Sequence, residues 1–100
     1  MGMRAVAVGG KAFVYAFRLA GIGGLVAESA RDALREVYRL VEEQNIGVIL
    51  VSDEYGSEFV EKIRQLSSST SRPVIYLLPR PGSRPERVEY RAILRRVLGI

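Results

Sequence analysis

The chain has 100 residues, 48% of them apolar, which suits a single globular domain with one hydrophobic core. It contains no histidine and no cysteine, so a zinc enzyme, a Ser-His-Asp hydrolase, a thiol enzyme and a disulfide scaffold are all excluded. The net charge of +4 lies entirely in residues 80–100, where six arginines accompany two glutamates, whereas residues 1–79 hold nine basic and nine acidic side chains.

The first 27 residues predict a strand, a helix and a second strand. Residues 4–8 (RAVAV) form a short apolar run that Gly9 and Gly10 end, which is typical of a buried strand. Residues 11–20 predict a helix because their large apolar side chains recur at helical spacing. These are Phe13, Val14, Phe17 and Leu19. Residues 21–24 (GIGG) predict a loop, and residues 25–27 are sufficient only for a short strand.

The next segment has the pattern of an amphipathic helix that ends near Gln44. Ser29 is a favourable N-cap, and Asp32 lies three residues later, where a capping-box acid is expected. The apolar face consists of Ala30, Ala33, Leu34, Val37, Tyr38 and Val41. Opposite charges at Asp32 and Arg35, and again at Glu36 and Arg39, indicate a solvated outer face.

Residues 46–51 (IGVILV) show no polar alternation, as expected of a strand covered on both sides of a parallel sheet. Ser52 and Asp53 are predicted to begin a third helix that continues to about Leu66. Its buried stripe is Phe59, Val60, Ile63 and Leu66. The serine-rich residues 67–71 predict a turn.

The remainder predicts a fourth strand, a link and a last helix. Residues 73–78 (PVIYLL) are apolar, and a proline is tolerated at the first position of a strand. The composition changes after Pro79, so we expect an α/β body in residues 1–79, a Pro/Gly linker in 80–85 and an arginine-rich amphipathic helix in 86–100, within one domain overall. The apolar stripe of that helix is Tyr90, Ile93, Leu94, Val97 and Leu98.

Strands and helices therefore alternate along the whole chain, which predicts an α/β fold. The simplest arrangement is an open four-stranded parallel sheet of order 2-1-3-4 with helices on both faces, a receiver-like or Rossmann-like architecture. A hinged C-terminal helix is added to it.

The crevice of such a sheet lies beyond the carboxyl ends of the first and third strands. Here the sequence places Gly9, Gly10 and Lys11 opposite residues 52–54. A phosphate-binding P-loop is not predicted, because Ala12 follows the lysine and the first glycine of the motif is missing. The glycines of 21–24 follow a helix instead of a strand, so a dinucleotide fingerprint is not predicted either. We therefore expect no nucleotide cofactor, and the glycines predict a tight turn.

A receiver domain of the response-regulator type is the alternative for this architecture. Its phosphoacceptor site needs carboxylates after the first strand and an aspartate after the third, which together hold a divalent cation. Asp53 is close to the second position, but Gly9 and Gly10 supply no carboxylate at the first. We expect no metal site, and Ser52 with Asp53 is interpreted as a helix N-cap.

Four arginines of the last segment share one side of the predicted helix. Arg84, Arg87, Arg91 and Arg95 are spaced three, four and four residues apart, and the apolar stripe lies beside them. Arginine suits bidentate contacts with carboxylates in partly buried interfaces. A partner protein therefore explains the segment best; a nucleic acid would require a broader basic field, and a plain solvated surface remains the third interpretation.

The sequence contains four characteristic segments: FRLAGI at 17–22, NIGVILVSDEYG at 45–56, RPVIYLLPRPG at 72–82 and RRVLGI at 95–100. In these segments the chain resembles the F subunit of the archaeal-type and vacuolar-type rotary ATPases. The resemblance covers nearly the whole chain in order and spacing. The glycine-rich VGGK at 8–11 departs from the family, in which an acidic or polar residue is common, and the linker is richer in arginine.

The resemblance implies a non-catalytic component of the central stalk. Such a protein has a receiver-like body and a C-terminal helix, binds the coiled-coil D subunit and turns inside the ring of catalytic A and B subunits. It couples ATP synthesis or hydrolysis to proton or sodium transport, without a cofactor of its own and without binding nucleic acid. The expected partner-binding residues are Arg84, Arg87, Tyr90, Arg91, Leu94 and Arg95 in the last helix and Ser52, Asp53, Glu54 and Tyr55 in the turn.

The expected location is the cytoplasm. No apolar run approaches the ~18 residues of a membrane span, and residues 1–10 lack the layout of a signal peptide. The resemblance implies that the protein is peripheral to the membrane, with which it associates only through its complex. A stand-alone signalling domain of the receiver type and a nucleic-acid adaptor remain the alternatives.

Overall fold

The computed structural model describes residues 3–79 and Arg95. Seven elements alternate along this part of the chain, each strand followed by a helix or by the end of the described range. They are β1 (Arg4–Gly9), α1 (Lys11–Leu19), β2 (Gly23–Val26), α2 (Ala30–Val41), β3 (Ile46–Ser52), α3 (Ser57–Ser69) and β4 (Val74–Leu78). The hinged helix predicted for residues 86–100 lies outside the described residues, apart from Arg95, which is helical and exposed.

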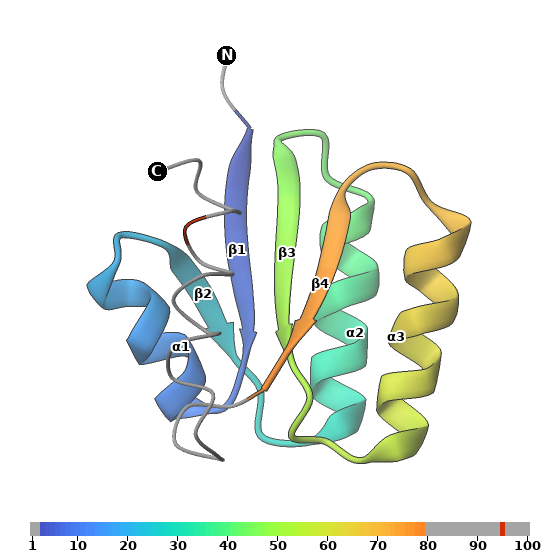
Figure 1. Ribbon diagram of the computed structural model, residues 1–100, viewed down its shortest axis with the longest axis horizontal. Helices are drawn as coiled ribbons and strands as arrows, with labels where there is room; N and C mark the ends of the chain where they lie inside the picture. Colours follow the sequence, from blue (N-terminus) through green and yellow to red (C-terminus); the bar gives the residue numbers. More distant parts are fainter. Residues whose placement is uncertain (1–2, 80–94, 96–100) are drawn as a thin grey trace.

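The four strands form one parallel sheet in the order β2-β1-β3-β4, which confirms the predicted order 2-1-3-4. Val6 pairs with Gly23 on one side and with Ile49 on the other, and Ser52 pairs with Leu78 at the far end of β3. All four strands run in one direction, so their carboxyl ends meet at the lower edge of the sheet in Figure 1.

Helices α2 and α3 cover one face of the sheet, where the larger core lies (Figure 1). Their buried side chains meet the β-branched residues that alternate along the strands. This core contains Val6, Val8, Ala27, Ala33, Val37, Leu40, Ile46, Ile49, Val51, Phe59, Ile63 and Ile75. Burial on this scale is the main stabilising term for a domain of this size.

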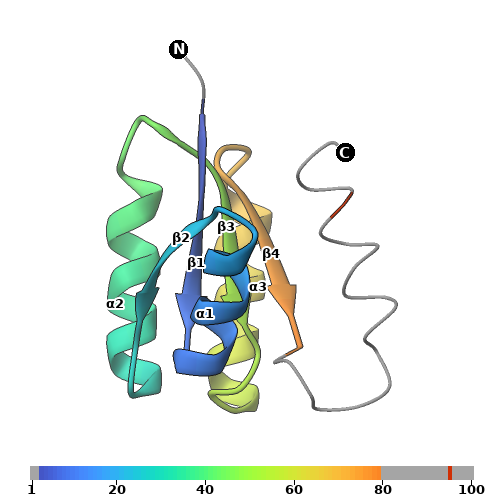
Figure 2. The same ribbon diagram turned by 90° about the vertical axis from the view of Figure 1, so that its left-hand side faces the viewer.

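Helix α1 covers the opposite face (Figure 2). Its three buried side chains, Phe13, Val14 and Phe17, pack against Ala7 and Leu50. The rings of Phe13 and Phe17 meet edge to face, with their centroids 4.9 Å apart. The predicted arrangement of helices on both faces is therefore confirmed.

The predicted cap of the second helix is also confirmed. The Ser29 hydroxyl accepts a hydrogen bond of 3.1 Å from the Asp32 N–H. The two predicted charge pairs form on the outer face: an Arg35 guanidinium nitrogen lies 2.9 Å from Asp32, and one of Arg39 lies 2.7 Å from Glu36. These pairs are exposed and contribute little to stability.

Several details differ from the sequence prediction. Leu19, expected on the buried stripe of α1, is 92% exposed. It lies two residues after the buried Phe17, which places it about 200° around the helix, on the side away from the core. Tyr38 is exposed and Leu40 is buried in its place. Strand β2 begins two residues before its predicted start, at Gly23, and α3 continues through Ser69 into the predicted turn.

Among the described residues, no helix has both the length and the apolar character needed to cross a bilayer.

Candidate functional site

The turn between β3 and α3, residues 53–56, lies at the carboxyl edge of the sheet, where the crevice of an open α/β sheet is found (Figure 1). Parallel pairing of β1 with β3 brings the end of β1 and the start of α1 alongside this turn. The turn thus adjoins the predicted glycine pair across a sequence separation of more than 40 residues.

A carboxylate of the protein itself occupies this crevice. Glu54 Oε2 accepts a hydrogen bond of 2.9 Å from the Gly10 N–H and one of 2.7 Å from the Ser52 hydroxyl. Ser52 is completely buried, and its hydroxyl also accepts a 3.3 Å hydrogen bond from the Glu54 N–H. Gly10 is the N-cap of α1, so the carboxylate lies at the positive end of that helix dipole, where a negative charge is stabilised.

The two glycines have a packing role in this arrangement. A Cβ at Gly10 would lie 2.6 Å from Glu54 Oε1, and a Cβ at Gly9 would lie 2.8 Å from the Ser52 Cβ. Both distances are shorter than real Cβ contacts. At Gly9 the Ser52 Cβ is fixed to the backbone of β3, so glycine is needed for this close approach. At Gly10 a Cβ would displace the end of the Glu54 side chain. The glycine pair thus accommodates Glu54, and the Gly10 N–H that could bind a phosphate is already used.

Two further hydrogen bonds tie the turn to the loop after β2 and to the end of β4. The Tyr55 hydroxyl donates to the Ala27 carbonyl over 2.6 Å, and the Asp53 N–H donates to the Leu78 carbonyl over 2.9 Å. The Tyr55 ring packs against Phe59 with centroids 4.9 Å apart. Burial, and then the nearby charge of Glu54, raise the pKa of the Tyr55 phenol above its ordinary value.

The predicted N-cap role of Ser52 and Asp53 is wrong. Ser52 is the last residue of β3, and α3 begins only at Ser57, with Gly56 as its N-cap and no side-chain cap. Gly56 has φ of +103°, a conformation in which a side chain is strained. The Asp53 side chain is exposed and has no hydrogen bond or ion pair with any residue of the described part.

The carboxylates at this edge do not assemble a cation site in the part of the chain that the structure describes. No group of three or more acidic side chains there is arranged to hold a metal ion. Glu54 is bonded to Gly10 and Ser52, and Asp53 extends into solvent.

The predicted partner-binding residues fall into two groups. The structure brings Ser52, Glu54 and Tyr55 together with Asp53 into one bonded turn. Of the other group, Arg95 is exposed, and five residues lie outside the described part. These five are Arg84, Arg87, Tyr90, Arg91 and Leu94.

Sequence reasoning missed two members of this site, the Gly10 N–H and the Ala27 carbonyl. Both act through the backbone, so their residue types carry no direct signal. The pair of adjacent glycines after the first strand was the available hint, because it marks a close approach of the backbone to another group.

Comparison with known proteins identifies the family of this chain. The sequence model of the ATP synthase (F/14-kDa) subunit family matches residues 5–97. The F subunit of the A-type ATP synthase of Methanothermobacter thermautotrophicus is 30% identical over 96 residues, which cover 93% of this chain and 90% of that protein. The F subunit of the A-type ATP synthase of Thermoplasma acidophilum is 25% identical over 93 residues, covering 93% of this chain and 88% of that protein. The chain therefore belongs to the ATP synthase (F/14-kDa) subunit family, as the resemblance of its sequence predicted.

Proposed function

We propose that the protein is a non-catalytic central-stalk component of an A/V-type ATP synthase. In this role it binds the coiled-coil D subunit, turns within the ring of A and B subunits and helps to couple ATP synthesis or hydrolysis to proton or sodium transport. Family membership over residues 5–97 supports assembly into an ATP synthase. The geometry of the crevice supports the non-catalytic role.

The observation that carries the proposal is the position of Glu54. In a nucleotide-binding or receiver domain, the crevice must leave backbone donors free for phosphate or carboxylates free for a cation. Here the Glu54 carboxylate accepts hydrogen bonds from the Gly10 N–H and from the buried Ser52 hydroxyl. Both donors and the nearest carboxylate are therefore already engaged with each other. The crevice is therefore suited to holding elements together, which a protein that transmits torque requires.

The contact with the D subunit is assigned to the arginine-rich segment and the turn at 53–56. The body has equal numbers of acidic and basic residues, so residues 80–100 supply the whole +4 charge. An acidic or amphipathic coiled coil complements that charge, and arginine forms bidentate contacts with its carboxylates. The turn adds a rigid surface, because hydrogen bonds tie it to the N-cap of α1, to β4 and to the loop after β2.

The test reverses the charge of two arginines in the predicted contact with the D subunit. We expect Arg91→Glu with Arg95→Glu to weaken binding to the purified D subunit by tenfold or more, on the order of the cost of breaking interfacial charge pairs. The melting temperature should change little. The matched control is Lys62→Glu with Arg64→Glu, which makes the same charge change at exposed positions of α3. Equal weakening by both pairs, or an equal loss of binding and stability, would contradict the assignment.

A further inference from the structure

Within residues 3–79, strand β2 is an open edge of the sheet. It is the terminal strand there, pairs with β1 and with no other described strand, and consists of Gly23, Gly24, Leu25 and Val26. An edge strand presents unpaired N–H and C=O groups, and proteins usually protect it with charged residues or proline. β2 has neither, and both Gly23 and Val26 are exposed.

A small cavity lies next to this edge on the face covered by α2. It has a volume of about 190 Å³ and extends between β1, β2 and the last turns of α2. Its apolar walls are Val6, Leu25 and Leu40, and its charged rim is Arg4, Arg39 and Glu43. Gly23 faces this side, because it pairs with Val6. A Cβ built at Gly23 would meet nothing within 4 Å, so the cavity can accept a side chain.

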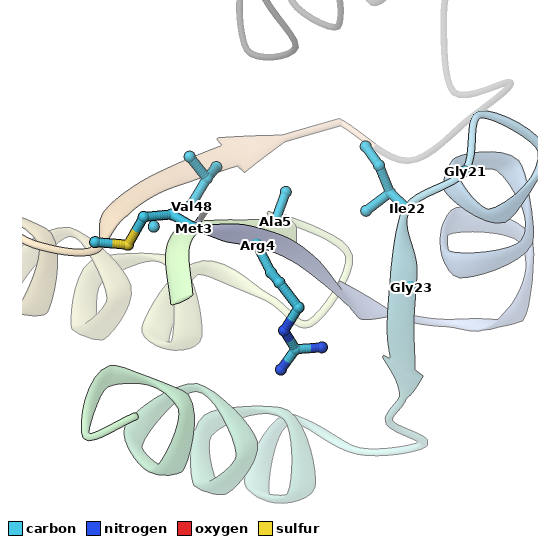
Figure 3. Close-up of a pocket in the computed structure, with 8 residues that line it drawn as sticks. Met3, Arg4, Ala5, Gly21, Ile22, Gly23 and Val48 are labelled. Atoms are coloured by element: carbon cyan, nitrogen blue, oxygen red, sulfur yellow. The ribbon is translucent and has the colours of Figure 1, made fainter. Parts of the chain in front are cut away.

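A second cavity of about 430 Å³ lies at the same end of the sheet (Figure 3). It shares Arg4 and Gly23 with the first. Figure 3 shows Ala5, Ile22 and Val48 directed to one side of the sheet and Arg4 directed to the other, toward α2. Consecutive residues of a strand point to opposite faces, so a strand added to β2 would direct one side chain toward each cavity.

Charge indicates what kind of strand this edge would accept. Arg39 is paired with Glu36 and with Glu43, whose oxygen lies 3.0 Å from it. Arg4 is exposed and has no ion pair among the described residues. The rim therefore has one unmatched positive charge. A second copy of this chain would bring its own Arg4 and a net charge of +4, which disfavours self-association.

We propose that β2 receives an extended segment of a partner protein as a fifth strand of the sheet. Backbone hydrogen bonds to β2 supply part of the affinity, an apolar side chain enters the cavity beside Gly23, and a carboxylate two residues away on the same face pairs with Arg4. This inference rests on the proposed function, since the partner is another component of the ATP synthase.

The first test compares amide hydrogen exchange in the free chain and in its complex with the purified subunits of the same ATP synthase. Successive N–H groups of a strand point to opposite edges, so alternate amides of residues 23–26 face away from β1. We expect these outward-facing amides to exchange about tenfold more slowly in the complex, because a new strand protects them. A complex in which these amides are unchanged would overturn the inference and leave the proposed function intact. Failure of any complex to form would contradict the proposed function itself. Protection that arises from a dimer of this chain, detected by its mass, would overturn the choice of partner.

The second test fills the cavity from inside with Gly23→Val. A valine suits a strand, and the space beside Gly23 accommodates it, so the melting temperature should stay the same or rise. Binding should weaken by about tenfold, since the partner's side chain loses its place. Arg4→Glu should also weaken binding, whereas Arg72→Glu, the same change at an exposed position before β4, should not. Unchanged binding by both Gly23→Val and Arg4→Glu would overturn the inference.

Discussion

Glu54 joins two parts of the chain that lie 44 residues apart in sequence, since its carboxylate accepts from Gly10 and from Ser52 two residues before it. Neither donor has another acceptor among the described residues. Ser52 is completely buried, so the loss of its acceptor leaves a polar group without water or protein to replace it. This one side chain thus determines whether the crevice is closed or has free donors.

The first prediction follows from these two hydrogen bonds. Glu54→Ala should lower the free energy of unfolding by about 1–3 kcal/mol, the usual cost of unsatisfied buried groups. Glu54→Gln should cost less, because an amide oxygen still accepts from Gly10. Urea denaturation measures both. Asp53→Ala is the control, since its exposed carboxylate has no partner among the described residues, and it should change stability by less than about 0.5 kcal/mol. Equal effects of Glu54→Ala and Asp53→Ala would show that the hydrogen bonds contribute nothing.

Tyr55 gives the same turn a dependence on pH. Its hydroxyl donates to Ala27, and burial together with nearby carboxylates raises the pKa of the phenol. The folded protein thus holds this proton more tightly than the unfolded chain, in which the pKa is about 10. The contribution to stability is complete below pH ~10 and decreases as the pH rises toward the folded-state pKa.

The second prediction concerns Tyr55→Phe. Near neutral pH this variant should be about 1 kcal/mol less stable, because it lacks the hydrogen bond to the Ala27 carbonyl. Between pH ~10 and ~11.5 its urea midpoint should fall less steeply than that of the unmodified protein, since one titrating group is absent. Tyr38→Phe, which removes a phenol hydroxyl at an exposed position of α2, is the matched control. Parallel slopes for all three proteins would disagree with the raised pKa.

At the scale of elements, the turn from β3 to α3 shows what sequence patterns can and cannot predict. The existence of both elements was predicted from an apolar run and a helical stripe, and both are confirmed. The start of the helix was misplaced by four residues, because Ser52 and Asp53 are common N-caps. The Glu54 hydrogen bonds and the positive φ of Gly56 extend the turn to Ser57, and neither leaves a clear pattern in sequence.

The third prediction tests this turn through its backbone. Gly56→Ala should destabilise the protein by about 1–3 kcal/mol, the cost of holding a side chain at a φ that favours glycine. A steric clash would not explain the loss, since nothing lies within 4 Å of a Cβ at this position. Gly23→Ala is equally unobstructed but has no positive φ, so it should be neutral or stabilising by up to about 1 kcal/mol. Thermal unfolding of the two variants, measured side by side, would refute the argument if their midpoints were the same.

The order of the strands in the sheet was predictable, because it follows from the regular alternation of strands and helices along the sequence. Alternation of strands and helices implies right-handed crossovers, and these leave few arrangements for four parallel strands. The errors concern apolar side chains that lie off the buried stripe, as Leu19 does, or neighbouring positions that are similarly apolar, as Tyr38 and Leu40 are. Periodicity identifies a face but does not locate its boundary.

For the whole molecule, the structure combines a closed crevice with surfaces suited to contacts. The described body is a packed sheet covered on both faces, with its turn at residues 53–56 bonded to the neighbouring strands. Such packing makes a domain rigid enough to transmit force. The crevice could not be predicted from sequence, because its closure depends on a contact between Gly10 and Glu54 that only the fold creates. The positive charge of residues 80–100, in contrast, was evident from composition alone.

Binding to the purified D subunit in the absence of nucleotide shows directly whether this protein is a component of the central stalk. Native mass spectrometry or size-exclusion chromatography at moderate salt would measure the complex, with a mixture of the A and B subunits alone as the comparison. We expect a stable, stoichiometric complex with the D subunit that then joins the A and B subunits. A chain that stays free in the presence of the D subunit, or that is labelled at Asp53 by a small phosphodonor with magnesium, would contradict this role.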